Sequence, residues 1–432
     1  MQTARGILAT VAALALVASA CGNSPSGEAG DDDGGGADGD DGAVTVDQPG
    51  VTDDTIRVGG VASVTNPLGG NYGDVFAGAQ AYFDMVNSEG GVHGRQIDLV
   101  SERDDQVASN QAEVQGLLAQ DDIFAAVPMA SLLFTGADLL VEENVPTFGW
   151  NINPEFGGPE NLYGEKGSFI CFTCPHPLVP WFADENGLEN VAVLAYGNSA
   201  QSAECAEGYV ASFAEFGDAE VVFEDTSLAF GVPDMKGQVR EMANRDVDLV
   251  LTCMDQTGVN TLAEDMNEEG LDAIQYLPNA YDPDFVEEFG DVFEGSFVAI
   301  EFWPFEVTED APEGMADYLR WTEETGAPRN EISMAGWLSA QLFVTGLREA
   351  GPDFTRQKVI DSLNELDSWT ADGLLPGVDW TIEHTEENPE SCFALVEIVD
   401  GEFVPRFGEP GKPFVCIAND AEELPDEPQR RG

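Results

Sequence analysis

Basic residues are scarce in this chain. Lys and Arg together number 17 against 81 Asp and Glu, and His occurs three times, so the formal net charge of the 432 residues is −64. This charge excludes nucleic acid as a partner and repels anionic lipid headgroups. Two explanations of the acidity stay open: a surface adapted to high ionic strength, where self-repulsion is screened, or a compositional bias of the lineage. Melting the protein in low and in molar salt would separate them.

Sequence motifs of catalysis are also missing. The chain has no G-x-S-x-G elbow, no H-E-x-x-H zinc motif and no phosphate-binding G-x-x-x-x-G-K-[ST] loop. Adjacent acids such as Asp104-Asp105 are expected by chance at this acid content, and we interpret them as solvated faces. We therefore expect no enzymatic activity, no catalytic residues, no cofactor and no resident metal.

Long apolar runs occur only at the amino terminus. Arg5 precedes the apolar segment Ile7–Val17, which is too short to span a membrane, and Ala18-Ser-Ala20 forms a small-residue cleavage site before Cys21. This arrangement resembles a bacterial lipoprotein signal, which implies that residues 1–20 are removed and that Cys21 carries the lipid. The alternative is an ordinary secretory signal with an incidental cysteine. Either way, we expect an extracytoplasmic location, with the lipid as the only attachment to the cell membrane.

Two acidic segments flank the region that we expect to fold. Residues 21–50 are rich in Gly, Asp and Ser and hold almost no large apolar side chains before Val44. Such a segment buries too little surface to fold, so it is predicted to be a disordered tether that extends by self-repulsion. Residues 418–432 are predicted to form an acidic tail.

Between these segments, strands alternate with helices. Ile56–Val61 is a β-branched run, the loop Ser63–Asp74 follows it, and apolar residues then recur at helical spacing over Val75–Val86. The same alternation continues along the chain and predicts two α/β units with mostly parallel sheets. Further strands are expected at Gln96–Val100, Phe124–Val127, Val145–Phe148, Phe169–Phe172, Val191–Leu194, Val221–Glu224, Leu249–Cys253 and Gln275–Leu277. Around Phe297–Trp303 the chain is expected to cross back to the first unit. Further helices are expected at Val107–Gln120, Thr135–Asn144, Ala200–Phe216, Pro233–Arg245, Gly258–Glu269, Glu313–Glu324, Met334–Ala350 and Phe354–Leu366. A hairpin is expected at Cys392–Pro405, turning at Asp400-Gly401.

Three short motifs resemble the substrate-binding proteins of branched-chain amino-acid ABC transporters, which belong to the type I periplasmic-binding-protein family. The motifs are Pro67-Leu-Gly-Gly-Asn-Tyr-Gly-Asp74, Asn87-Ser-Glu-Gly-Gly-Val-His-Gly94 and Asp104-Asp105. The resemblance implies two Rossmann-like lobes joined by a three-stranded hinge. It also implies lobe one from residues 51–170 and 301–375, and lobe two from residues 171–300 and 376–417. Partners would be a small-molecule ligand and the permease subunits of an ABC importer, with the receptor itself a monomer.

Six cysteines remain after Cys21, an even number that suggests disulfides in an exported protein, with 15 possible connectivities. Sequence position favours Cys392–Cys416, which would staple the terminal hairpin, while Cys205 and Cys253 could meet in lobe two. Cys171 and Cys174 would then form a short structural disulfide at the lobe crossing. A redox-active pair, or a metal site completed by His176, is the alternative for these two cysteines.

Candidate ligand-binding residues cluster in the loops that leave the strands, where open α/β sheets bind small molecules. Tyr72 matches the family's aromatic residue in its loop, and Ser131 lies within one place of the family's ligand-binding serine. Aromatic faces supply an apolar wall, and Ser or Asn side chains add directional hydrogen bonds. The predicted ligand-binding residues are Tyr72, Ser131, Leu132, Trp150, Asn151 and Asn153 in lobe one, and Tyr196, Asp255, Tyr281 and Asp282 in lobe two.

Two departures from the family pattern bear on the ligand. Asn151-Ile152-Asn153 stands where amino-acid binders use a Ser/Ala/Thr-rich loop for the ligand carboxylate, and Pro278–Asp282 lacks their Glu for the ammonium. An amino acid, an amide, a urea-like compound or an aromatic acid therefore all stay open. The predicted function is a solute receptor of an ABC importer. The alternatives are a sensor of the same fold and an exported hydrolase or redox protein that uses Cys171 and Cys174.

Overall fold

The computed structural model describes residues 45–432, and the predicted signal peptide and Cys21 lie outside them. In lobe one a five-stranded sheet has the strand order β2-β1-β3-β4-β5, and every pair is parallel. Its strands are β1 (Thr55–Ala62), β2 (Gln96–Asp104), β3 (Ala125–Ala130), β4 (Thr147–Gly149) and β5 (Leu162–Gly164).

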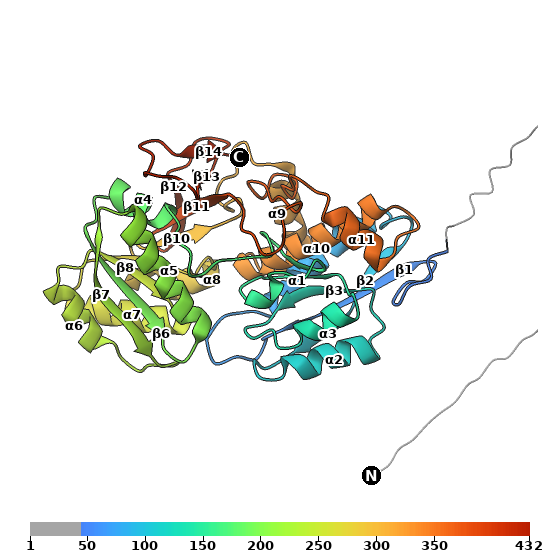
Figure 1. The fold of residues 1–432 in the computed structure, drawn as a ribbon, viewed down its shortest axis with the longest axis horizontal. Helices are drawn as coiled ribbons and strands as arrows, with labels where there is room; N and C mark the ends of the chain where they lie inside the picture. Colours follow the sequence, from blue (N-terminus) through green and yellow to red (C-terminus); the bar gives the residue numbers. More distant parts are fainter. Residues whose placement is uncertain (1–44) are drawn as a thin grey trace, which may run out of the picture. The chain divides into compact units, whose positions relative to one another are not determined.

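Helices cover both faces of this sheet, because successive side chains of a strand point to opposite sides. Val58 and Val127 lie in the core under α1 and α10, whereas Val61 and Met129 lie in the core under α2 and α3. The helices α9 and α10, late in the sequence, pack against α1, and α11 packs against α10 (Figure 1). The helices of this lobe are α1 (Asp74–Ser88), α2 (Asn110–Gln120), α3 (Ala137–Glu142), α9 (Glu313–Thr325), α10 (Glu331–Ala350) and α11 (Arg356–Leu363).

Lobe two contains a nine-stranded mixed sheet. The order β14-β13-β11-β10-β9-β8-β6-β7 combines a parallel half, β6 to β10, with an antiparallel half that β12 joins by pairing with β11. The parallel strands are β6 (Asn190–Tyr196), β7 (Glu220–Leu228), β8 (Leu249–Cys253), β9 (Ile274–Leu277) and β10 (Phe297–Ile300). The antiparallel strands are β11 (Glu390–Val399), β12 (Glu402–Arg406), β13 (Phe414–Ala418) and β14 (Gln429–Arg431).

The second sheet is also covered on both faces. Val193 and Leu251 pack against α4 and α5, and their neighbours Leu194 and Val250 pack against α6 and α7. The helices are α4 (Leu178–Glu185), α5 (Ala200–Phe216), α6 (Lys236–Asn244), α7 (Gln256–Glu269) and α8 (Pro283–Phe289), with the 3-10 turn η2 (Gly290–Val292). The 3-10 turn η1 (Pro154–Phe156) belongs to lobe one, between β4 and β5. Among residues 45–432, no helix is long and apolar enough to cross a membrane.

The chain passes between the lobes three times: after β5, after β10, and between α11 and β11. Two α/β lobes connected in this way confirm the predicted fold class. The terminal hairpin is also confirmed, because β11 and β12 pair across Asp400-Gly401, which have φ values of 51° and 77°. Positive φ at both positions is typical of the two-residue turn that Asp-Gly favours.

Several predicted boundaries are wrong for local physical reasons. Phe169–Phe172 forms no strand, because its backbone lies in the first crossing, where the Cys171 N–H donates to the Glu387 carboxylate at 2.7 Å. Helix α2 begins at Asn110 rather than at Val107, which has φ 67° and donates its N–H to Asp105. Helix α4 was missed because Pro177 and Pro180 suggest a loop, yet proline is tolerated in the first turn of a helix.

Three disulfides form, with the pairs expected from the sequence: Cys171–Cys174, Cys205–Cys253 and Cys392–Cys416. The last pair joins β11 to β13 and so does not staple the β11–β12 hairpin. Two flanking segments also contact the fold. Gln48, in the expected tether, accepts a hydrogen bond from the Arg356 N–H, and β14, in the expected acidic tail, pairs with β13.

Candidate functional site

A cavity lies between the lobes, where the loops that follow β1, β8 and β9 converge with the start of α10. It measures about 400 Å³, including the part open to solvent. Its lining comes from three parts of the chain: Gly70, Asn71 and Tyr72; Asp255, Gln256, Asn279, Tyr281 and Asp282; and Asn330, Glu331 and Ile332. The structure therefore brings four predicted residues together, Tyr72, Asp255, Tyr281 and Asp282.

Several hydrogen bonds join the lobes around the cavity. The Thr257 hydroxyl donates to the Leu68 carbonyl at 3.1 Å, and the Glu331 N–H donates to the Tyr281 carbonyl at 3.0 Å. The Gln201 side-chain amide donates to the Ile152 carbonyl. Gly69 allows the first contact, because a Cβ there would lie 2.7 Å from the Thr257 hydroxyl oxygen and its φ is +88°.

Lobe one supplies an aromatic wall. The rings of Tyr72 and Trp150 lie 5.3 Å apart and both side chains are buried. Burial raises the pKa of Tyr72 above its ordinary value, and the Asp255 and Glu331 carboxylates raise it further, so the phenol stays protonated. The Trp150 indole N–H has no hydrogen-bond partner among the described residues. Of the two rings only Tyr72 lines the cavity, and the predicted Trp150 packs against it without lining the cavity itself.

The two carboxylate oxygens of Asp255 have different surroundings. One oxygen caps α7 by accepting from the Thr257 and Gly258 N–H groups at 2.9 and 3.2 Å. The other oxygen is buried and has no hydrogen-bond partner among residues 45–432. The nearby Tyr196 hydroxyl is buried, and burial together with Asp255 raises the pKa of Tyr196. A helix cap therefore fixes a carboxylate whose second oxygen is unused.

Asp282 and Tyr281, in contrast, make structural bonds. Asp282 caps α8 by accepting from the Asp284 N–H at 3.0 Å, and burial raises the pKa of Asp282. The Tyr281 hydroxyl donates to Glu306 at 2.6 Å and accepts from the Phe305 N–H at 2.8 Å. Both residues line the cavity, but the Asp282 carboxylate and the Tyr281 hydroxyl already form hydrogen bonds with other groups of the protein.

The predicted serine and asparagines of lobe one are not among the residues that line the cavity. Ser131 is buried and accepts from the Asn110 side-chain amide at 2.8 Å, and its carbonyl accepts from Asn153 at 2.7 Å. The Asn151 N–H donates to Glu165 at 3.2 Å, and the Leu132 N–H donates to the Ser63 hydroxyl at 3.0 Å. These contacts hold the loops in place, and a direct ligand role for these residues stays a prediction.

One lysine lies among three glutamates beside the cavity. Lys166, in the first crossing, pairs with Glu301 and lies 3.9 Å from Glu165, and its charge acts on Glu331. Burial raises the pKa of Glu165 to about 8 and that of Glu331 to about 7, in both cases against the opposing charge of Lys166. Although burial alone would lower it, the pKa of Lys166 is raised by Glu301 and Glu165.

Three residues of the cavity lining were not predicted from the sequence: Asn330, Glu331 and Ile332. Asn330 caps α10 through the Ser333 N–H and also donates to the Asp74 carboxylate at 2.7 Å. That second contact spans 256 positions of sequence. A capping signal for a helix is readable at Asn330, but its meeting with the first loop depends on tertiary packing.

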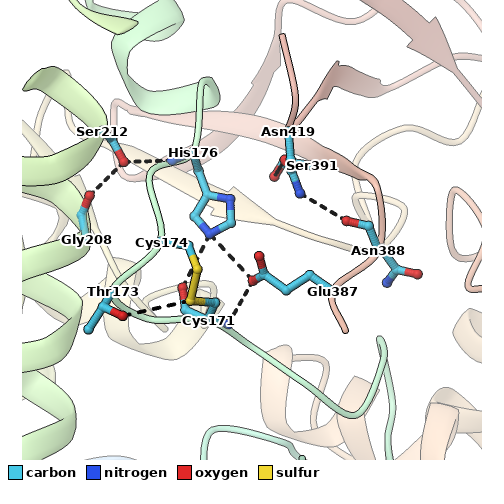
Figure 2. Close-up of polar contacts among 10 residues, drawn as sticks. All are labelled: Cys171, Thr173, Cys174, His176, Gly208, Ser212, Glu387, Asn388, Ser391 and Asn419. Carbon is cyan, nitrogen blue, oxygen red and sulfur yellow. Dashed lines mark hydrogen bonds and ion pairs between the residues drawn. A yellow bond between two sulfur atoms is a disulfide. The ribbon is translucent and has the colours of Figure 1, made fainter. Parts of the chain in front are cut away.

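Figure 2 shows a second polar cluster, at the Cys171–Cys174 disulfide. Glu387, from the third crossing, accepts a hydrogen bond from the Cys171 N–H and lies 3.6 Å from the His176 ring. The backbone N–H of His176 donates to the Ser212 hydroxyl at 2.9 Å. The two sulfurs and Glu387 lie close enough to hold a metal ion. Because the sulfurs are joined, neither offers the thiolate that a metal or a redox reaction needs. The cluster therefore ties the first crossing to the third.

Residues 55–402 match the family described as periplasmic binding protein. Among curated proteins, nothing matches the chain. Among solved structures, the chain resembles a fatty acid ABC transporter substrate-binding protein from Thermomonospora curvata at 19% identity, with a TM-score of 0.67 and coverage of 87% of this chain and 94% of that one. It also resembles the branched-chain amino acid binder LivJ from Streptococcus pneumoniae in complex with isoleucine, at 15% identity, TM-score 0.68 and coverage of 82% and 100%.

A third similar structure is a solute binding protein from R. palustris in complex with benzoate, at 17% identity, TM-score 0.66 and coverage of 85% and 98%. Proteins of this family bind solutes for ABC transporters and are not enzymes, which removes the hydrolase or redox hypothesis. The family match spans most of the chain, and the two-lobed fold agrees with it. The chain belongs to the periplasmic binding protein family, in its type I form.

Proposed function

We propose that this protein is the extracytoplasmic receptor of an ABC importer and captures a small polar or amphipathic solute between its lobes. The observation that carries the proposal is the cavity built jointly by both lobes at the loops that leave their strands. Hinge closure of two lobes buries a ligand at such a place and creates a surface that exists only in the closed form. The permease subunits would recognise that surface.

The range of the similar proteins supports a receptor without fixing its ligand. Those proteins are named for fatty acid, isoleucine and benzoate, three compounds with different chemistry. The lining here mixes Tyr72 and Ile332 with amide and carboxylate groups, which suits a ligand that is partly apolar and partly polar. A monomer attached to the membrane by a lipid on Cys21 would complete the proposed arrangement.

A thermal-shift screen of the full chain in high salt tests the proposal. The panel holds amino acids, amides, urea, amines and aromatic acids. A ligand at a hundredfold excess over its Kd adds about 2.7 kcal/mol to the free energy of unfolding, which raises the Tm by a few degrees in a protein of this size. Failure of every compound to shift the Tm would count against the receptor.

Two tyrosine variants provide the matched comparison. Tyr72→Ala removes a ring from the cavity wall. Tyr209→Ala removes a half-buried ring of α5, which packs against the core between α4, α5 and the sheet of lobe two and lies away from the cavity lining. Both variants are expected to lose stability, but only Tyr72→Ala should also lose the ligand-dependent shift. An equal ligand response in both variants would place the ligand elsewhere.

A further inference from the structure

The charged side chains that line the cavity are all acidic. They are Asp255, Asp282 and Glu331, and none of the eleven lining residues is Lys, Arg or His. The lysine whose charge acts on Glu331, Lys166, is already paired with Glu301 and flanked by Glu165. An anionic group in this cavity would therefore meet negative charge from both lobes without a free cation to bind it.

Hydrogen bonding separates these acids into used and unused groups. Asp282 is occupied by the cap of α8, where it accepts from the Asp284 N–H. Asp255 Oδ2 and Glu331 Oε2 are buried atoms with no hydrogen-bond partner among the described residues. The Tyr196 hydroxyl near Asp255 is buried too, with its residue 2% exposed. Buried carboxylate oxygens without a partner are costly unless a donor meets them.

The hydroxyl groups that could have received a ligand carboxylate are already engaged. Ser63 donates to Asp105 at 2.7 Å and accepts from the Leu132 N–H, and Ser131 accepts from Asn110, which also donates to Asp105 at 3.1 Å. This buried network closes on itself. It leaves no hydroxyl donor of these two serines directed to a ligand.

Tyr72 lines the cavity together with these two carboxylates. Asp255 and Glu331 both act on Tyr72, whose ring also contacts Trp150. A cation over the face of an aromatic ring is attracted by the negative charge of that face. A protonated amine, unlike a quaternary ammonium group, also has N–H donors for Asp255 Oδ2 and Glu331 Oε2.

We propose that the cavity selects protonated amines that carry no carboxylate, with the ammonium group held between Asp255 and Glu331 against the ring of Tyr72. This inference rests on the receptor function proposed above and names its class of ligand. It predicts that a zwitterionic amino acid binds more weakly than the amine of the same skeleton, because its carboxylate meets the acidic lining.

Isothermal titration with two matched series tests the inference. One series is isopentylamine, leucine and 4-methylpentanoate, and the other is 2-phenylethylamine, phenylalanine and 3-phenylpropanoate. In at least one series we expect the amine to bind tenfold or more tighter than both other members. If an acid or an amino acid binds best in both series, the receptor function stands and the amine inference fails. If no compound of either series binds, the inference fails and the receptor function loses support with it.

Substitutions locate the ammonium group. Asp255→Asn keeps the N-cap of α7, because Asn caps helices as well as Asp does. It also replaces the charged carboxylate by a neutral amide. Asp255→Asn and Glu331→Gln are each expected to weaken binding of the better amine at least tenfold. Asp284→Asn is the control, because Asp284 is an exposed acid near the cavity that does not line it, and less than a threefold change is expected. Equal losses of affinity in all three variants would mean that only the total negative charge matters, and would overturn the proposed position of the ammonium group.

Discussion

The cavity and the lobe crossings are both rich in acidic groups, yet they use them differently. In the crossings, Glu301 pairs with Lys166, and Glu387 accepts a backbone N–H and lies beside His176. In the cavity, Asp255 and Glu331 each keep a buried oxygen without a partner. In a chain with this many acids, acidity alone does not mark a binding site. Unused hydrogen-bonding capacity in a buried place does, because folding leaves it uncompensated.

The largest expected effect lies in the crossings. Lys166→Met removes the cation that Glu165, Glu301 and Glu331 share, and it leaves partly buried carboxylates without a counter-charge. Breaking a buried pair from one side costs about 3 kcal/mol. Urea unfolding at pH 8 should show this loss. The control Lys412→Met, at an exposed lysine, should change the free energy of unfolding little, and a similar loss there would contradict the comparison.

The second largest effect concerns the Cys171–Cys174 disulfide, which is expected to affect the stability of the fold and not the choice of ligand. Replacing Cys171 and Cys174 together by Ser opens a disulfide of sequence separation 3, which is expected to cost about 2 kcal/mol. Because these residues lie in the crossings and outside the cavity lining, the order of ligand affinities should be preserved. Titration of both matched series with this variant checks that expectation. A change in the preferred ligand would mean that the two regions are not separate.

Lowering the pH should weaken binding of an amine. The pKa of Glu331 is raised to about 7 by burial against Lys166, with Glu301 adding to the rise, while Glu165 and Tyr72 are the other titratable groups around it. From pH 8 to pH 6 most Glu331 becomes protonated, so affinity should fall by up to about tenfold. Glu331→Gln should bind weakly at both pH values, with a much smaller dependence.

Without ligand, the sign of the pH effect is reversed. Glu165 and Glu331 hold protons in the folded state at pH values where the unfolded chain, with glutamate pKa near 4.5, has lost them. The free energy of unfolding contributed by these groups therefore falls as the pH rises from about 5 to 8. Thermal melts over that range check it, and Glu331→Gln should flatten part of the slope. A slope of the opposite sign in the wild type, unchanged in the variant, would contradict it.

The smallest expected effect concerns closure. Thr257→Val removes the hydroxyl that donates to the Leu68 carbonyl across the cavity. An exposed hydrogen bond contributes about 0.5 kcal/mol, so ligand affinity should fall about twofold. Thr261→Val is the matched control, because its hydroxyl bonds to the Thr257 carbonyl within α7 and joins no lobes. Identical affinities for both variants would show that this contact does not favour the closed form.

The fold was largely predictable because its signal is local and repeated. Alternating β-branched runs and helical periodicity placed β1, α1 and most later elements, and the motifs at Asn87 and Asp104 indicated the family. The crossings were less predictable: Cys171 lies in an extended segment bonded to Glu387 rather than to a strand. Sequence patterns carry no information on such a partner, which lies 216 positions away.

The candidate site was predictable only in part. Asp255 was found because it follows a strand, where parallel sheets place ligands, and Tyr72 was found because its loop resembles that of the family. Ser131 was selected by resemblance, yet the structure engages its hydroxyl with Asn110. Glu331 was missed because its place beside Tyr72 and Lys166 depends on α10 packing against α1. A residue's type and spacing do not reveal whether its hydrogen-bonding capacity is already used.

The packing of α10 on α1 also bears on how the protein matures. Asn330, at the start of α10, is 256 positions beyond its partner Asp74 at the start of α1. At synthesis rates of about 5 to 20 residues per second, the apolar face of α1 waits roughly 10 to 50 s for its cover. Over that interval the incomplete chain exposes apolar surface that can associate with other chains. The acidic composition, with a net charge of −64 for the full chain, opposes association between copies of the incomplete chain over that interval, because like charges repel.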